Sequence, residues 1–284
     1  MPEHLVFHVV LLGQILLLSL FLPWRIVRRM KHVLETYPPA SHPKLYPKPF
    51  EHYEKARRNY WVTNLVMVLA GVAVLAVLMG TPRSGSWDQA IATWLFLAQM
   101  APVLLLDLSA LKEYRLMRES RARTQRKAVL KPRRLRDFVS LTSLAIGGGT
   151  YVAFVVLIVY IRQFDFPWFG GYWNIAGVTG LNLFLASIVF WHMYGKKLNP
   201  HQSDEDRRRQ IEVAARVMLF TSIAATVSIA LSVVLAALDL RSFEPVARSL
   251  YFQLLAAICL QVYYRSDLTR NFEVYKNEPS GSPV

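Results

Sequence analysis

Seven long stretches of the chain are almost purely apolar, and each has about the length that a helix needs to cross a bilayer. A helix spans the hydrocarbon core, about 30 Å thick, with about 20 residues. These stretches carry few charges and do not alternate between apolar and polar residues as barrel strands do. The sequence therefore predicts an all-α, polytopic membrane bundle with seven spans, at approximately 4–22, 61–80, 90–108, 138–161, 173–194, 214–238 and 247–264.

The basic residues are concentrated in alternate gaps between these stretches. The segments 23–60, 109–138, 195–216 and 265–284 hold 29 of the 33 Lys and Arg residues. Loops rich in Lys and Arg stay on the cytoplasmic side of a membrane. This positive-inside pattern predicts an outside N-terminus and a cytoplasmic C-terminus. It indicates an integral, multi-pass protein of the bacterial inner (cytoplasmic) membrane.

We expect residues 1–284 to form one transmembrane domain. Its cytoplasmic parts are a Pro-rich connection at 23–60, a basic connection at 109–137 and a tail at 265–284. The six spans after the first form three hairpins of similar length, which either a triplicated hairpin or simple bilayer geometry explains. Five prolines within residues 37–49 exclude a regular helix and predict an extended, partly polyproline-II path across the inner face.

The net charge of +14 would suggest nucleic acid in a soluble protein, but here the topology explains it, and we expect no nucleic-acid partner. Residues 112–136 hold eleven Lys or Arg. Such a run beside a membrane attracts anionic headgroups by about 1 kcal/mol per basic residue, although a simple topology determinant has the same composition. The candidate contacts with anionic lipid are Arg121, Arg123, Arg126, Lys127, Lys131, Arg133 and Arg134.

Polar residues within the spans are candidates for chemistry, because charge in lipid is costly. Gln99 and Asp107 are eight residues apart, on either side of Pro102, and we expect them to share a helical face. The alternative is that Gln99 bonds a neighbouring helix while Asp107 pairs with Lys112 or an interfacial arginine. The candidates for a shared polar cavity are Gln99, Asp107, Asn182, His192, Gln253 and Gln261.

Two local patterns predict particular features. Six of the twelve residues from Arg162 to Trp173 are aromatic, which indicates an interfacial belt or a lid over a cavity for a lipidic ligand. Ser203, followed by three acidic residues, predicts the capped start of a helix that continues into the sixth span.

The sequence contains no HExxH, GxSxG or Walker pattern, and its single cysteine, Cys259, excludes a disulfide framework. We assign no catalytic residue and no metal site, and the sequence identifies no cofactor.

Three functions remain open at this point. The scarcity of intramembrane charge favours a non-enzymatic membrane subunit that binds lipids, a partner protein or a second copy of itself. A transporter or channel for a neutral or lipidic solute would use the polar faces of spans three, five and seven. A lipid-modifying enzyme would use Asp107 and His192 at the cytoplasmic headgroup level. A cavity shared by the polar residues would favour the last two functions, and separate surroundings would favour the first.

Overall fold

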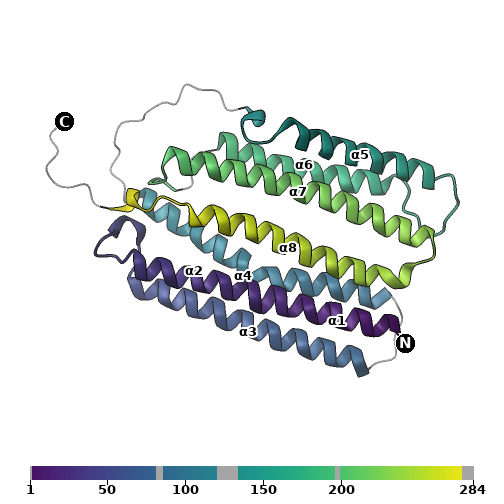
Figure 1. The fold of residues 1–284 in the computed structure, drawn as a ribbon, viewed down its shortest axis with the longest axis horizontal. Coiled ribbons are helices and arrows are strands. Elements are labelled where there is room, and N and C mark those ends of the chain that lie inside the picture. The colour runs from purple at the N-terminus through teal and green to yellow at the C-terminus, as the bar shows by residue number, and fades with distance from the viewer. Residues whose placement is uncertain (1, 81–85, 120–133, 196–198, 277–284) are drawn as a thin grey trace.

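The computed structural model describes residues 2–80, 86–119, 134–195 and 199–276, and these residues form helices and no strand (Figure 1). Within these described residues, seven helical segments are long and apolar enough to cross a bilayer. The predicted all-helical architecture with seven candidate spans is therefore confirmed. It is compatible with an integral, multi-pass membrane protein, while the orientation in the membrane stays a prediction.

Each of the seven apolar stretches overlaps one long helical segment. The α-helices are α1 (Pro2–Leu16), α2 (Leu22–Thr36), α3 (Phe50–Gly80), α4 (Ser86–Glu119), α5 (Leu141–Ile161), α6 (Trp173–Tyr194), α7 (Asp204–Ala237) and α8 (Glu244–Leu268). The short helices are η1 (Leu17–Phe21), η2 (Pro43–Leu45), η3 (Leu135–Asp137), η4 (Arg241–Phe243) and η5 (Glu273–Tyr275).

The first span is longer than its apolar stretch, because α1, η1 and α2 form one continuous helical segment. Pro23 has no N–H to donate to the carbonyl of Ser19, which would interrupt an ordinary α-helix. The π-helical turn η1, in which the N–H of Leu22 donates to the carbonyl of Leu17, lies directly before this proline. The helix then continues to Thr36, so the first part of the 23–60 connection is helical.

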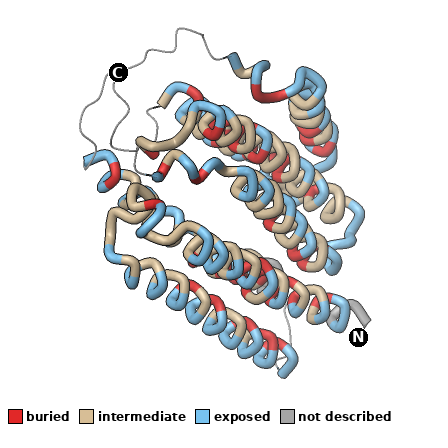
Figure 2. Tube along the Cα trace, turned by 60° about the vertical axis from the view of Figure 1, so that its left-hand side comes forward, coloured by how far each residue is buried: buried red, intermediate tan, exposed pale blue. Residues whose placement is uncertain are grey.

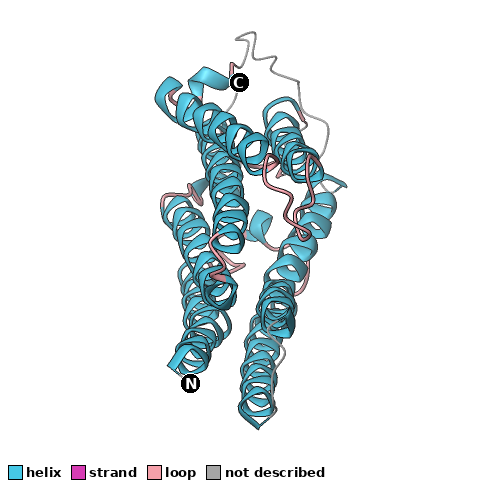
Figure 3. Cartoon of the chain, turned by 90° about the vertical axis from the view of Figure 1, so that its right-hand side faces the viewer, coloured by secondary structure: helices cyan, strands magenta, loops and turns pink. Residues whose placement is uncertain are grey.

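The helices form two groups, with α5, α6 and α7 in the upper one in Figure 1 and α1 to α4 and α8 in the lower one, and Figure 3 shows these helices joined by loops. In one group, α1, α3, α4 and α8 pack on one another, and α2 packs on α3. In the other group, α5 and α6 both pack mainly on α7. The groups meet where α7 contacts α8, and the Thr221 hydroxyl and Cys259 thiol lie 3.9 Å apart there.

Buried residues follow the inward faces of the helices, and the outward faces are exposed along their length (Figure 2). Many of the exposed side chains are large and apolar, such as Leu69 at 70% exposure, Trp94 at 70% and Leu183 at 67%. A soluble protein rarely presents such a surface to water, whereas hydrocarbon covers it favourably.

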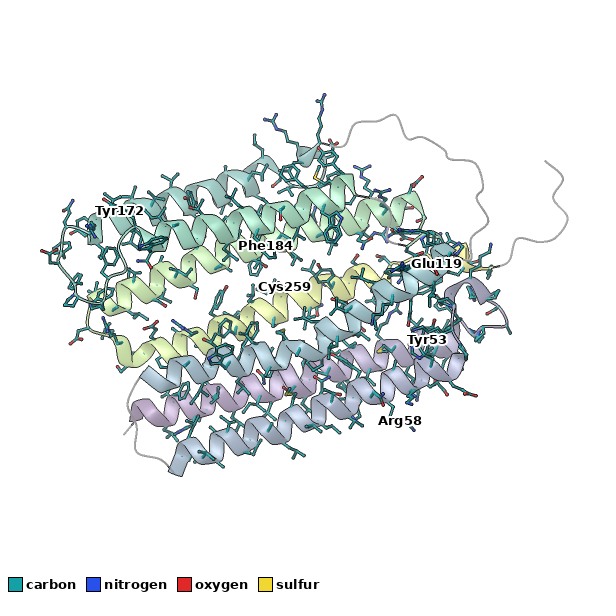
Figure 4. The ribbon with its side chains drawn as sticks, turned by 180° about the vertical axis from the view of Figure 1, so that it is seen from behind. Tyr53, Arg58, Glu119, Tyr172, Phe184 and Cys259 are labelled. Carbon is teal, nitrogen blue, oxygen red and sulfur yellow. The ribbon has the colours of Figure 1, made fainter. Side chains whose placement is uncertain are left out.

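The two ends of the bundle differ in composition. We call the end that holds residues 37–49 and 269–276 the basic end, and the end that holds residues 162–172 the aromatic end. Figure 4 shows Tyr53 at the basic end and Tyr172 at the aromatic end.

Two sequence predictions about the basic end have different outcomes. The Ser203 cap is confirmed, since its Oγ accepts the N–H of Asp206 at 3.0 Å. The extended path of residues 37–49 is wrong, because the segment forms turns. The N–H of His42 donates to the carbonyl of Pro38 at 3.0 Å, and other turns follow along the segment. These local bonds satisfy backbone groups that an extended chain would leave to water.

Cysteine labelling tests the predicted orientation. In a Cys259→Ser background, Ala40→Cys at the basic end should react with an impermeant maleimide only after the membrane is opened, whereas Asp165→Cys at the aromatic end should react in intact cells. The positive-inside rule requires this difference. The reverse pattern would contradict the orientation.

Candidate functional site

Four buried side chains form a hydrogen-bonded network that joins α1, η1, α4 and α8. The Nε2 of Gln14 donates to Oε1 of Gln99 at 3.0 Å, and the hydroxyl of Ser249 donates to Oε1 of Gln14 at 2.6 Å. The Nε2 of Gln99 donates to the hydroxyl of Ser19, on the π-helical turn, at 3.1 Å. All four side chains are buried. Both amides therefore use their nitrogen and their oxygen, as apolar surroundings require.

Gln253 extends this network by one turn along α8. Its Nε2 donates to the carbonyl of Val10 at 3.0 Å and lies 3.4 Å from the hydroxyl of Ser249. The expectation that Gln99 bonds a neighbouring helix is confirmed. Gln99 and Gln253 thus belong to one network, in which both amide nitrogens and Oε1 of Gln99 bond other helical segments.

The other candidates for a shared polar cavity lie in separate surroundings. Asn182 Oδ1 accepts the hydroxyl of Ser222 at 2.8 Å, between α6 and α7. Gln261 Oε1 accepts Nη1 of Arg25 at 2.6 Å, between α8 and α2. The Nδ1 of His192 donates to a backbone carbonyl one turn earlier in its own helix, at 2.9 Å. Each residue therefore has a local partner, and the shared cavity stays a prediction.

Asp107 and Gln99 do not share a face of α4. Gln99 is buried, whereas Asp107 is exposed and lies within electrostatic range of Tyr60 and Tyr263. At 3.6 residues per turn, positions eight residues apart point in directions about 80° apart around the helix axis. The expected common face for Gln99 and Asp107 was therefore wrong. Among the described residues Asp107 also forms no ion pair with Lys112, because five residues place the two side chains about 140° apart.

At the basic end, the segment after α8 folds back across the bundle. The ring of Phe272 stacks on that of Tyr37, with centroids 4.2 Å apart. Tyr275 is fully buried, and its hydroxyl accepts Nη2 of Arg270 at 2.6 Å and Nδ2 of Asn199 at 2.5 Å. This segment therefore joins the 37–49 connection to the α6–α7 connection.

Two arginines bond the end of α8 and the segment that follows it. Arg29 on α2 donates from Nε to Oδ2 of Asp267 at 2.7 Å and from Nη2 to the carbonyl of the same residue at 2.9 Å. Arg209 on α7 donates from Nη1 to the carbonyl of Thr269 at 2.6 Å. Charge-assisted bonds of this kind are among the stronger hydrogen bonds in proteins.

A cavity of about 250 Å³ lies beneath this closure. Its walls come from α2, the 37–49 connection, α3, α4 and the end of α8 with the residues that follow. Its lining combines aliphatic side chains with a set of charged side chains and a set of aromatic side chains. The charged lining residues are Arg29, Glu113, Asp267 and Arg270, and the aromatic lining residues are Tyr46, Tyr53, Tyr114 and Phe272.

Several polar groups of this lining have unused hydrogen-bonding capacity. Glu113 lies 3.7 Å from Nε2 of His52 and 4.0 Å from Nζ of Lys48, and both distances are too long for hydrogen bonds. The Tyr53 hydroxyl is buried without a partner in the part of the chain that the structure describes. A buried polar group in this state requires a further partner, such as water or a ligand.

Burial shifts the titration of the tyrosines beside the cavity and the tail. It raises the pKa of Tyr46 and of Tyr275, so both phenols stay neutral at physiological pH. Burial alone would lower the pKa of Arg270, but Tyr275, Tyr114 and Asp267 outweigh it and raise that pKa above its ordinary value. The guanidinium therefore remains charged.

A larger hollow, of about 530 Å³, lies at the aromatic end. A single segment, from Arg162 to Ala176, supplies its lining. The guanidinium of Arg162 lies 5.4 Å from the centre of the Tyr172 ring, and Trp173 is 83% exposed. Exposed aromatic rings of this kind are typical of an interfacial belt. We favour the smaller cavity as the functional site, because it has walls from five segments and buried polar groups.

The basic-end cavity was not predicted from the sequence. Six of the seven candidate lipid contacts, between 121 and 133, lie outside the described residues, and Arg134 is exposed. The usable signal was the presence of aromatic residues within polar segments, at Tyr46 and Tyr53 and again at Phe272 and Tyr275. These residues are far apart along the chain, so their meeting was not visible.

Comparison with known protein families, with characterised proteins and with solved structures found no match for this chain. The fold is compatible with the class of helical multi-pass membrane proteins, and the function has to be argued from the site itself.

Replacing Gln14 by leucine tests the buried network. Gln99 loses its donor and Ser249 its acceptor, so we expect a loss of about 1–2 kcal/mol of stability and a midpoint lower by roughly 2–4 °C in thermal unfolding in detergent. The matched control is Gln163→Leu, in the exposed connection between α5 and α6. Equal midpoints for the two variants would contradict a stabilising network.

Replacing Tyr275 by phenylalanine tests the closure of the basic end. Arg270 and Asn199 lose their common acceptor, so the tail should open more often and trypsin should cut after Arg270 about tenfold faster. Tyr160→Phe, at a tyrosine that is 55% exposed, serves as the control. An unchanged cleavage rate would show that the hydroxyl does not hold the tail.

Proposed function

We propose that this protein is a non-enzymatic integral membrane protein that binds phospholipid in the cavity at its basic end. The supporting observation is the composition of the cavity lining. It combines charged and tyrosine side chains with apolar ones such as Met30, Val33 and Leu34. Helix ends where charged and tyrosine side chains meet apolar surface are the level at which headgroups lie.

The size of the cavity supports a headgroup as its occupant. Sites that enclose a drug-sized molecule have volumes of about 300–1,000 Å³. A cavity of about 250 Å³ is smaller, and it suits a headgroup with its glycerol while the acyl chains lie against the apolar exterior. A partner protein would instead need about 800 Å² of matching surface on each side.

The distribution of the intramembrane polar groups argues against the other two functions. A transport path requires several polar groups along one channel, but Gln14, Gln99, Ser249 and Gln253 bond one another and the backbone. A lipid-modifying enzyme that uses His192 and an acid would need them together. The His192 ring bonds its own helix instead.

Native mass spectrometry of the full-length protein after gentle solubilisation tests the proposal. We expect about one phospholipid per chain to survive transfer from the detergent micelle. Ala110→Trp, which fills the cavity from α4, should reduce bound lipid about tenfold by steric exclusion. Ala90→Trp, at an exposed position on the same helix, should retain it.

The alternatives give different spectra. A lipid-free wild-type protein, or lipid that survives equally in both tryptophan variants, would overturn the proposal. Recovery of a second polypeptide or of a dimer, without lipid, would favour the protein-binding function.

A further inference from the structure

We infer that the basic-end cavity selects a zwitterionic headgroup, one that carries both a phosphate and an amine, as phosphatidylethanolamine does. This inference rests on the proposed function and adds the class of headgroup. Its basis is the charge balance of the lining, in which two arginines face two carboxylates: Arg29, Arg270, Glu113 and Asp267. A purely anionic headgroup would leave Glu113 with only the long ion pair to Lys48, at 4.0 Å, as its counter-charge, which is unfavourable where water is scarce.

The two arginines of the lining suit the phosphate. Arg29 uses Nε and Nη2 on Asp267, and Arg270 uses Nη2 on Tyr275. The remaining Nη1 of Arg270 lies 4.0 Å from the carboxylate of Asp267, which is beyond hydrogen-bond range. Within the described residues, both Nη1 groups are therefore left to donate to phosphate oxygens, in the charge-assisted geometry that guanidinium groups prefer.

A second group in the lining, Glu113 with Tyr46 and Tyr53, suits the ammonium. Glu113, whose side chain is only 18% exposed, has no contact shorter than 3.7 Å with a cation. The unpartnered hydroxyl of Tyr53 lies in the same lining, and the ring of Tyr46 meets that of Tyr53 edge to face at 5.1 Å. An ammonium offers three N–H donors and is attracted to aromatic faces. A carboxylate, a phenol oxygen and tyrosine rings together fit that group.

His52 and Lys48 are the competitors for Glu113. His52 Nε2 and Lys48 Nζ lie 3.7 and 4.0 Å from the carboxylate, and these side chains are 44% and 28% exposed. Because partly exposed groups at distances beyond hydrogen-bond range gain little from such pairs, an ammonium in the cavity can take their place.

A free zwitterion, such as glycerophosphoethanolamine, has the same headgroup chemistry as the lipid. The aliphatic part of the lining favours the lipid, because a free headgroup would leave Met30, Val33 and Leu34 without an apolar partner.

Lipid competition on the full-length protein tests the selectivity. The protein in detergent is mixed with equal amounts of phosphatidylethanolamine and phosphatidylglycerol, and native mass spectrometry gives the ratio bound. We expect the wild type to favour phosphatidylethanolamine about tenfold, the discrimination typical of one hydrogen bond to a charged group. Glu113→Gln should bring the ratio near one by lowering phosphatidylethanolamine alone.

Two further variants keep the test decisive. Glu119→Gln, at an exposed carboxylate on the same helix, is the matched control and should keep the wild-type ratio. Tyr53→Phe keeps the ring and removes only the hydroxyl, and it should lower the preference about threefold even if Glu113→Gln fails to fold. If both Tyr53→Phe and Glu113→Gln keep the wild-type lipid ratio, the assignment is overturned. If Glu113→Gln fails to fold, an unchanged ratio in Tyr53→Phe alone overturns it.

The outcomes separate this inference from the proposed function. Wild-type protein that holds both lipids without preference overturns the headgroup selectivity and leaves lipid binding intact, whereas protein that holds neither overturns both. Soluble glycerophosphoethanolamine that binds as tightly as the lipid would retain the zwitterion chemistry and overturn the membrane lipid as its source. If glycerophosphoglycerol displaces the bound lipid as readily as glycerophosphoethanolamine does, the selectivity is overturned.

Discussion

The arrangement of this bundle depends on the buried glutamines that bond across three helices. An amide without partners in an apolar interior costs several kcal/mol, so a helix that carries one must meet a complementary group. Gln14 receives the hydroxyl of Ser249 and donates to Gln99, which fixes α1, α4 and α8 along and around their axes. Apolar contacts alone would allow these helices to slide, because hydrocarbon and leucine side chains are similar surroundings.

Close packing at glycines also holds neighbouring helices together. A Cβ added at Gly71 on α3 would lie 2.9 Å from the side chain of Ile15, so the glycine lets α3 approach α1 closely. The same distance separates a Cβ at Gly147 from Leu219, between α5 and α7. Membrane helices commonly associate through such small residues. The basic-end cavity is lined by residues near the ends of α2, α3, α4 and α8 and by residues of the segment that follows α8.

The sequence predicted the fold better than it predicted the site. Each span depends on a run of about 20 local residues, and the Ser203 cap depends on three, so both were visible. The length of the first helix was missed because the π-helical turn before Pro23 is a backbone adjustment that composition does not reveal. The prediction that Asp107 shares a face with Gln99 was wrong because eight residues do not make a whole number of helical turns.

The sequence by itself determined the number of candidate spans, the apolar exterior and the uneven distribution of basic residues, since each follows from the composition of a single segment. Only the tertiary structure decided which polar groups meet. Arg29 and Asp267 are 238 residues apart, and Gln14 and Ser249 are 235 apart. No local pattern relates such residues. Their meeting, and with it the balanced charge of the cavity, arises from packing and hydrogen bonding among all the helices that converge there.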